Sequence, residues 1–311
     1  MNAASSAALQ RTMIERARAS FIAACELDIA VRKPGNVSRV SGGHGMRAAL
    51  FSASARASLE PLFRVGARVG QRLESAVAAT WAAAGCNTNL GILLLCAPIA
   101  RAIELNPQAQ DPAALRRAIE AVLADLDLDD AHAAYRAIAR ANPGGLGSAP
   151  SEDVHAGATT TLRAAMALAA DRDSIARQYR DGYAELFELG LAPLGEGLPW
   201  DLASVDVTNV DEPLPPVVVA AVQRIYLAFL AHRPDSHIVR KHGSAVAHTV
   251  MRSAQAWEAR AQAGAVLDAD PAFAAWDLEL KAAGLNPGTS ADFTVAALFV
   301  AGLVGPHAAP R

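Results

Sequence analysis

The sequence predicts an all-α protein folded as one large multi-helix globular domain. Hydrophobic residues make up 52% of the chain and aromatic residues only 5%, with alanine prominent throughout. This composition favours helices, because alanine has the highest helix propensity whereas strands are rich in β-branched and aromatic residues. Apolar residues recur at helical spacing, and no alternation of strand and helix patterns is visible. A chain of 311 residues can bury a sizeable core.

The expected helices follow from apolar stripes and from residues that begin or end helices. Residues 11–32 carry one apolar stripe, and Pro34 ends that helix because the residue before a proline is pushed out of the α region. Elsewhere, prolines at first helical positions and aspartates before apolar stripes mark the starts. The other expected helices are 47–58, 61–84 with Pro61 first, 88–103, one beginning at Asp111-Pro112, one from Asp129 to before Asn142, 151–169, 175–189, 217–232, 236–262, 271–283 and 290–304.

The helical domain is expected to span residues 10–305, between a disordered N-terminal tail (1–9) and a C-terminal tail (306–311). Residues 190–216 are rich in glycine and proline and show no clear period. Irregular segments of this length are uncommon inside compact domains. This segment is therefore the candidate boundary between two closely packed lobes.

Charge and cysteine content exclude several classes of protein. A formal net charge of −3 and a pI near 6.2 offer no basic surface for nucleic acid. The cysteines Cys25, Cys86 and Cys96 are odd in number and form no C-x-x-C pair, so we expect free thiols in a reducing cytoplasm. The N-terminus lacks the pattern of a signal peptide. A homodimer is compatible with the sequence but not required by it.

One uncharged segment, residues 75–100, is long enough to raise the question of a membrane span. The polar run Asn87-Thr88-Asn89 at its middle argues against that, so we expect a soluble protein without a membrane partner. Any one of these side chains alone would be interpreted as a helix cap. Three together between apolar helices predict the floor of a ligand pocket, where a helix N-terminus attracts phosphate.

Glycine-rich loops precede this segment at residues 33–38 and 41–45. Such loops can bring backbone N–H groups close to a ligand. Lys33 lies about two helical turns after Glu26, so the two side chains share a face at the end of the first helix. The loops lack the G-x-x-x-x-G-K-[ST] spacing and no strand precedes them, which excludes a Walker P-loop.

Two charged clusters do not fit an ordinary core. The first is Asp171-Arg172-Asp173, where a surface pair with Arg177 explains only Asp173. The second is residues 235–243, in which Asp235 can cap a helix that carries Arg240 and Lys241, and this basic face favours phosphate binding.

The remaining polar residues of the chain argue against a zinc site and against a serine hydrolase. His237 and His242 do not form an H-E-x-x-H pair, so a zinc site is not expected. Residues 286–292 form a polar turn into the last helix, either as a cap or as amide and hydroxyl contacts to a ligand. No G-x-S-x-G elbow is present. These carboxylates, cations, amides and glycine loops are suited to binding a polyphosphate through Mg²⁺ and cationic side chains. A carboxylate or a histidine could then supply acid–base chemistry.

Taken together, these motifs resemble the triphosphoribosyl-dephospho-CoA synthase family. The resemblance runs in order along nearly the whole chain. It rests on Cys25-Glu26-Leu27, Lys33-Pro34-Gly35-Asn36-Val37, Phe51-Ser52-Ala53-Ser54, Gly85-Cys86-Asn87-Thr88-Asn89-Leu90-Gly91, Asp153 with Met166, Asp171-Arg172-Asp173, residues 235–243 and residues 286–292.

The resemblance implies an all-helical transferase that moves a 5-triphosphoribosyl group from ATP to the 2′-hydroxyl of 3′-dephospho-CoA and releases adenine. Its product is a prosthetic-group precursor for citrate lyase or malonate decarboxylase. Such a reaction needs an acid for the leaving base, a base for the acceptor hydroxyl and groups that hold the triphosphate. The catalytic candidates are Glu26, Asp171 and Asp173, of which Glu26 and Asp171 are also the candidate Mg²⁺ ligands. The candidates for binding substrate or nucleotide are Lys33, Asn36, Ser38, His44, Asn87, Thr88, Asn89, Arg172, Asp235, Ser236, His237, Arg240, Lys241, Ser290 and Asp292.

The central motif departs from the family pattern. Synthases of citrate lyase clusters typically read Asn-Thr-His-Lys-Gly where this chain reads Asn87-Thr88-Asn89-Leu90-Gly91, so a histidine and a lysine are missing. Their basic helix also tends to end in Arg-Gly-Gly, whereas this one ends in Arg240-Lys241-His242-Gly243. The chain therefore resembles a divergent branch, for which a ribosyl transfer in the synthesis of a methanopterin-type one-carbon coenzyme is the specific alternative. A nucleotide-binding protein without turnover is the other class, and the retained carboxylates weigh against it.

Overall fold

A computed structural model describes residues 3–148, 151–194, 205, 207 and 212–304 of the chain. These residues form α-helices, short 3-10 helices and loops, and the only extended pairing among them is an isolated bridge between Gly43 and Met46. The predicted all-α class is confirmed. None of the helices in this part of the chain is long and apolar enough to cross a membrane.

The helices follow one another through short connections for most of the chain. In order they are α1 (Ala3–Ala30), α2 (Ala48–Leu62), α3 (Val69–Ala84), α4 (Leu90–Leu105), α5 (Pro112–Ala124), α6 (Leu128–Ala141), α7 (Leu162–Ala169), α8 (Ser174–Asp181), α9 (Ala184–Gly190), the 3-10 helix η1 (Ala192–Leu194), α10 (Pro216–His232), α11 (Ser236–His242), α12 (Ser244–Gln262), the 3-10 helix η3 (Leu267–Ala269), α13 (Pro271–Ala282) and α14 (Gly288–Leu303).

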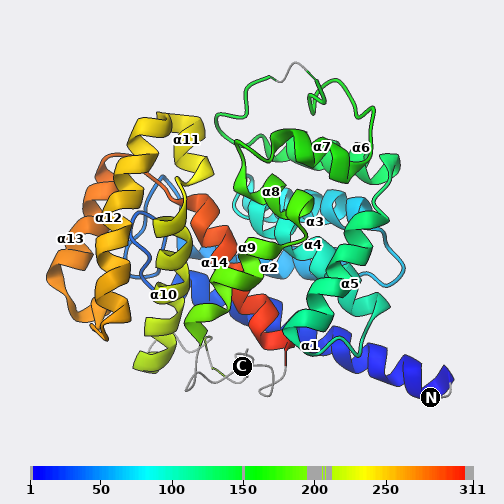
Figure 1. The fold of residues 1–311 in the computed structure, drawn as a ribbon, viewed down its shortest axis with the longest axis horizontal. Helices are drawn as coiled ribbons and strands as arrows, with labels where there is room; N and C mark the ends of the chain where they lie inside the picture. The colour runs from blue at the N-terminus through cyan, green and yellow to red at the C-terminus, as the bar shows by residue number, and fades with distance from the viewer. Residues whose placement is uncertain (1–2, 149–150, 195–204, 206, 208–211, 305–311) are drawn as a thin grey trace.

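Helix α14 runs through the middle of the molecule (Figure 1), with α10–α13 on one side and α2–α6 on the other. Nearly all of its side chains are buried, which its uninterrupted apolar sequence requires. The larger hydrophobic core joins α14 to α1–α6, and a smaller core lies among α10–α13. Because α10 and α14 contribute to both cores, the start of α14 lies where the two sides of the molecule meet.

Helix α4 is held in place by a proline within it. Pro98 has no N–H, so the carbonyl of Leu94 loses the hydrogen bond it would accept in a regular helix. The buried Tyr179 hydroxyl of α8 donates to Leu94 O instead, at 2.7 Å. The Tyr183 hydroxyl donates to the next carbonyl, Leu95 O, at 2.8 Å. These bonds fix the position of α4 relative to the segment that carries the Asp171–Asp173 cluster.

The expected helix 61–84 is wrong, because the chain leaves the helix after Leu62 and re-enters it at α3. Pro61 ends α2 instead of beginning the next helix. The intervening loop is held by Arg72, a buried side chain that donates to Leu62 O at 2.6 Å and to Ala67 O at 2.9 Å. Arg72 also pairs with the buried Glu104. Hydrophobic periodicity does not reveal a buried guanidinium that binds loop carbonyls. The sequence pattern therefore predicted one helix where the structure has two.

Three further helix predictions need correction. The expected helix 175–189 is broken at Gly182, and the expected helix 236–262 is broken at Gly243; both glycines have positive φ. The helix expected to begin at Ser151 begins at α7, where the side chain of Thr161 accepts a hydrogen bond from Ala164 N. In each case a capping residue lay within an apolar pattern that continued across it.

The ends of the chain and the expected lobe boundary give a mixed outcome. Helix α1 begins at Ala3, so the structure continues the helix through most of the N-terminal segment for which a disordered tail was expected. Leu9 packs against the core there. The expected C-terminal tail, 306–311, and much of the candidate boundary 190–216 lie outside the described residues.

Candidate functional site

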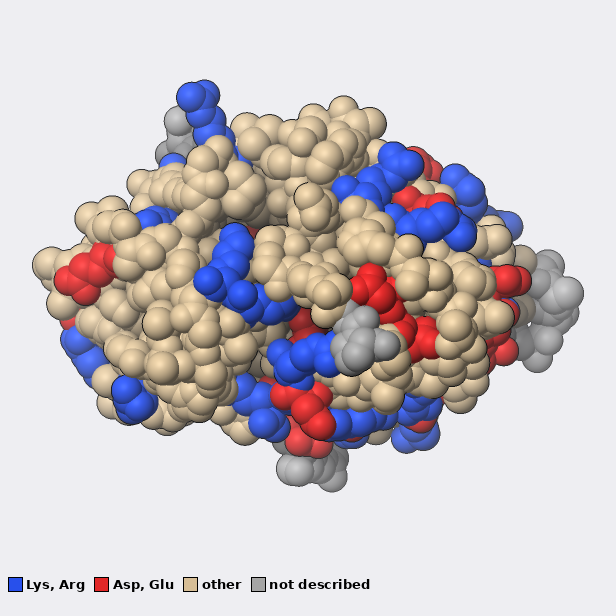
Figure 2. Space-filling view, turned by 90° about the horizontal axis from the view of Figure 1, so that it is seen from above, with Lys and Arg blue, Asp and Glu red and all other residues tan. Residues whose placement is uncertain are grey.

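A cavity of about 790 Å³ lies where the N-terminal ends of four helices meet. Its wall comes from the loop before α2, the start of α4, the loop after α6, the start of α8, helix α11 and the turn into α14. Its volume is that of a typical site for a small ligand. Figure 2 shows basic and acidic side chains gathered around the hollow in the middle of the upper face.

The four helices α4, α8, α11 and α14 each contribute residues of their first turn, or of the cap before it, to the cavity wall. The N-terminus of a helix carries a partial positive charge and unpaired N–H groups. Asp173 accepts from first-turn N–H groups of α8, and Asp235 does so for α11 and α14, so the start of α4 is the helix end best suited to an anionic ligand such as a phosphate. Three cationic side chains of the same wall, Arg172, Arg240 and Lys241, act in the same direction.

The central polar motif lines this cavity at the start of α4, where the sequence placed the floor of a ligand pocket. Asn87 Oδ1 accepts from Leu90 N at 3.2 Å, and the Thr88 hydroxyl donates to Ser54 Oγ at 2.6 Å. Asn89 is buried, and its Nδ2 has no hydrogen-bond partner among the described residues. Two of the three side chains therefore shape the loop, and the third keeps a free donor.

Asp173 and Arg240 join α8 to α11 at the cavity wall. Asp173 Oδ1 accepts from Ile175 N at 2.9 Å and from Ala176 N at 3.0 Å, which caps α8. Its other oxygen pairs with Arg240 Nη1 at 2.7 Å. This half-buried ion pair connects the start of α8 to α11. The sequence pattern had identified both residues but had paired Asp173 with Arg177.

Asp292 presents the one carboxyl of this wall that has no hydrogen bond or ion pair with any described residue. It lies in the first turn of α14 and packs directly against Gly91 of α4, where a Cβ atom would be 2.6 Å from Asp292 Cγ. Burial raises the pKa of Asp292 well above its ordinary value, and the carboxylates of Asp28, Asp235 and Asp173 add to that effect. A carboxyl group in these surroundings holds its proton into the pH range where ordinary carboxyls are ionised.

Histidine His237 adds a neutral ring to the cavity. Burial, together with the positive charges of Lys241 and Arg240, lowers its pKa to about 3, so the imidazole is uncharged at neutral pH. Its ring packs against Gly288, where a side chain would collide with it. His237 therefore acts here as a neutral hydrogen-bonding ring rather than as a cation.

Asn36 and His44, two of the candidate binding residues, line the cavity from the glycine-rich loops. Asn36 Nδ2 donates to Asn286 Oδ1 at 2.9 Å, and His44 Nε2 is 2.8 Å from Gly35 O. Gly35 has a φ of +81° and its N–H donates to Asp277 at 2.8 Å, so helix α13 anchors this loop.

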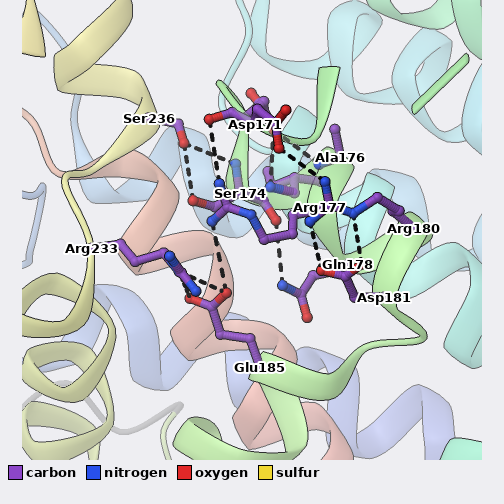
Figure 3. A network of polar contacts seen from close by, with 12 residues as sticks. Asp171, Ser174, Ala176, Arg177, Gln178, Arg180, Asp181, Glu185, Arg233 and Ser236 are labelled. Carbon is purple, nitrogen blue, oxygen red and sulfur yellow. Dashed lines mark hydrogen bonds and ion pairs between the residues drawn. The ribbon is translucent and has the colours of Figure 1, made fainter. Parts of the chain in front are cut away.

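Asp171 lies away from the cavity. Its side chain is 97% exposed and pairs with Arg180 at 3.0 Å. Figure 3 shows it within a chain of contacts that runs along α8 toward Glu185 and Arg233. The two aspartates that flank Arg172 therefore have different positions, because only Asp173 caps α8 and turns toward α11.

Glu26 is also absent from the cavity wall. It is buried in a network of its own, where it accepts from Arg39 at 2.8 Å, from Ser52 at 3.0 Å and from Arg56 at 3.5 Å. A carboxylate so engaged and an exposed one held by Arg180 do not fit a shared magnesium site. The described residues contain no group of three or more His, Cys, Asp or Glu side chains that could hold a metal ion.

Lys33 and Ser38 also face the protein rather than the cavity. The Lys33 ammonium is fully buried and lies 3.0 Å from Asp28 Oδ1. Ser38 is buried and bonds to Ser41 O within its own loop. Both residues hold the loop after α1, and neither is available to a phosphate.

Three of the predicted binding residues connect helix ends by hydrogen bonds: Asp235, Ser236 and Ser290. Asp235 accepts from the N–H groups of His237 and Ile238, and from the N–H and hydroxyl of Ser290, both at 2.8 Å. Ser236 Oγ accepts from Ser174 N at 2.9 Å. These bonds tie the N-termini of α8, α11 and α14 together. The three residues were predicted to bind a ligand, and their polar atoms bind helix ends instead.

Several residues of the cavity wall belong to no motif of the sequence. Asp28 lines the wall although only Glu26, two positions earlier, carried a motif. Tyr135 donates to Glu152 at 2.7 Å, and both line the cavity from α6 and the loop that follows it. The positive φ of Glu152 marks this turn but is not visible in the sequence. The only sequence feature that could have identified Asp28 is its position as a polar residue on an otherwise apolar face of the first helix.

Comparison with known proteins identifies the family. A profile of the family described as CitG, ATP:dephospho-CoA triphosphoribosyl transferase, matches residues 14–310. The chain belongs to this family. It is therefore a transferase of the triphosphoribosyl-dephospho-CoA synthase type, and ATP is a substrate in the family reaction.

A solved structure shares the fold. It comes from Archaeoglobus fulgidus and is described as that of a candidate triphosphoribosyl-dephospho-CoA synthase. The two chains are 20% identical and superpose with a TM-score of 0.58, over 83% of this chain and 98% of the other. A search of curated proteins gives no match.

Proposed function

We propose that the protein transfers the 5-triphosphoribosyl group of ATP to the 2′-hydroxyl of 3′-dephospho-CoA and releases adenine. The family membership supports a reaction of this type. The observation that carries the proposal is the unpartnered carboxyl of Asp292, which has a raised pKa and lies in a cavity bounded by cations and helix N-termini. Such a carboxyl is suited to give a proton to a departing base, and the cations to hold a polyphosphate.

The triphosphate is assigned to the basic part of the wall. Arg240 and Lys241 come from α11 and Arg172 from the turn before α8, close to the N-terminus of α4. Guanidinium groups bind phosphate oxygens through charge-assisted hydrogen bonds, which are stronger than neutral ones. Magnesium enters the proposal as a partner of the triphosphate, whose oxygens can supply most of its ligands.

The chemical step breaks the bond between C1′ of the ribose and N9 of adenine. The protonated Asp292 gives its proton to the adenine ring, so the base leaves as neutral adenine. The oxygen of the acceptor hydroxyl bonds to C1′, and the proton of that hydroxyl passes to Asp173, which is paired with Arg240. An acid and a base of this kind usually have different surroundings, as Asp292 without a partner and Asp173 beside a guanidinium do here.

The test is adenine release. The purified protein is incubated with ATP and Mg²⁺, with and without 3′-dephospho-CoA, and the products are separated by chromatography and identified by mass spectrometry. We expect adenine together with triphosphoribosylated dephospho-CoA. The absence of both, in a preparation that binds ATP, would refute the acceptor assignment or the turnover.

A second acceptor class is supported by one feature of the wall. Leu90 lines the cavity beside the buried Asn89, at the two positions where citrate lyase synthases carry a lysine and a histidine. An apolar side chain there favours a less charged acceptor. A ribosyl transfer in the synthesis of a methanopterin-type coenzyme is this alternative, and pterin-linked acceptors are the next compounds to try. Nucleotide binding without turnover on either acceptor would assign the protein to the non-catalytic class.

A further inference from the structure

Two buried hydrogen-bond donors of the cavity wall have no acceptor among the described residues. Asn89 is 5% exposed, and its Nδ2 is buried without a partner. Arg240 Nε is also buried without a partner, although the same guanidinium pairs with Asp173 through Nη1. Leaving such a donor without an acceptor is costly, so two in one cavity indicate a group that the ligand supplies.

Two backbone donors accompany them at the start of α4. The N–H of Leu90 is satisfied by Asn87, and that of Leu93 bonds to Asn89 O. The N–H groups of Gly91 and Ile92 between them have no acceptor within the described part of the chain. They are first-turn amides of a 16-residue helix, and both residues line the cavity. All four donors belong to residues that line the cavity, three of them at the start of α4 and one on α11.

We propose that the head of α4 is a phosphate subsite, in which the Asn89 amide and Arg240 Nε donate, with the N–H groups of Gly91 and Ile92, to one phosphate group of the donor triphosphate. A phosphate group accepts hydrogen bonds on several oxygens and donates none when ionised, which matches donors from several directions. A hydroxyl or an adenine edge would need an acceptor as well. The assignment to a triphosphate rests on the proposed function; the donor geometry does not.

The substitution Asn89→Asp tests the subsite, because it keeps the shape of the side chain and replaces the donor with an acceptor. Asn87→Asp is its matched control. It adds the same charge two residues away, and it keeps the oxygen that accepts from Leu90 N. The probe is inorganic tripolyphosphate, titrated by calorimetry, with adenosine as a ligand that has no phosphate. Thermal unfolding shows whether each variant is folded, and Asn89→Ala removes the donor without adding charge.

We expect Asn89→Asp to bind tripolyphosphate about 10- to 100-fold more weakly than Asn87→Asp, since a hydrogen bond to a charged group is lost. Asn89→Ala should also bind more weakly than the wild type, and adenosine binding should be unchanged. Arg240→Lys keeps a positive charge beside Asp173 but lacks Nε, so a loss of about tenfold is expected. Equal tripolyphosphate affinity for the two aspartate variants, or an unchanged affinity for Asn89→Ala, would overturn the subsite.

The binding assay separates this inference from the proposed function. Tripolyphosphate binding that depends on Asn89, without adenine release on any acceptor tried, supports the subsite and refutes the transfer reaction. The opposite result is adenine release by a protein whose tripolyphosphate affinity is unchanged by substitution of Asn89 or Arg240. That result supports the transfer reaction and refutes the subsite.

Discussion

Replacing Gly91 with alanine should disable catalysis through a residue that has no side chain. A methyl group on Gly91 would lie 2.6 Å from Asp292 Cγ and 2.9 Å from Ile175 Cδ1. Carbon atoms in contact are about 3.5–4.0 Å apart, so the Asp292 carboxyl must retreat by about 1 Å. A misplacement of this size at a catalytic group can cost about 100-fold in rate. We therefore expect kcat for adenine release to fall about 100-fold in Gly91→Ala.

The fold should survive this change. Alanine is favoured over glycine in a helix by about 1 kcal/mol, which offsets part of the steric cost. The control is Gly42→Ala, since a Cβ there meets only Met46 O, at 3.7 Å. Thermal unfolding of both variants and steady-state kinetics of adenine release give the comparison.

A double-mutant cycle decides whether Gly91 acts through Asp292. Asp292→Asn removes the proton that we assign to the leaving base, a loss typical of about 10²–10⁴ in rate. With the acid gone, the added methyl group no longer displaces a catalytic group, so kcat of Gly91→Ala/Asp292→Asn should match that of Asp292→Asn alone. A double variant that loses another 100-fold, or a Gly91→Ala variant with kcat within twofold of the wild type, would refute the reasoning.

Three further variants test the assignments around the cavity. The pKa of Asp292 is raised in the folded protein, so this residue lowers stability increasingly as pH rises above about 4. The Tm of Asp292→Asn should therefore exceed that of the wild type by more at pH 7 than at pH 4. An equal Tm difference at the two pH values would contradict this. Lys33→Met leaves the buried Asp28 carboxylate without its partner and should lower the free energy of unfolding by about 3–5 kcal/mol in denaturant titrations, with recovery in Lys33→Met/Asp28→Asn. Asp171→Asn loses only an exposed pair with Arg180, so adenine release should stay within about twofold of the wild type; a large loss would return Asp171 to the catalytic group.

The helical class and most helix positions could be predicted because they depend on local chemistry. Aspartates that precede apolar stripes cap α5, α8, α11 and α13 in the structure. The failures come from tertiary contacts. Arg72 stabilises a loop inside the expected helix 61–84 by binding its carbonyls, and no period of the sequence reports such a bond.

In the candidate site too, the sequence does not show which of two nearby carboxylates lines the cavity. Glu26 and Asp28 lie two positions apart on one helix, about 200° around its axis, so they face different surroundings. The motif emphasised Glu26, which Arg39 and Arg56 engage, whereas Asp28 lines the cavity. Which face meets the cavity depends on how α1 packs against its neighbours, and a single sequence does not contain that information.

Polar residues of the motifs therefore divide into two groups that only the hydrogen bonds distinguish. Asp235 satisfies four donors and Lys33 is paired with Asp28 of α1, so both are fully used in holding the structure. Asn89 Nδ2 is buried without a partner, and Asp292 has no hydrogen bond or ion pair with a described residue. A folded chain retains a buried donor or carboxyl in that state at a cost to its stability. Both residues line the cavity, and we propose that the ligand supplies the missing partners of these two groups.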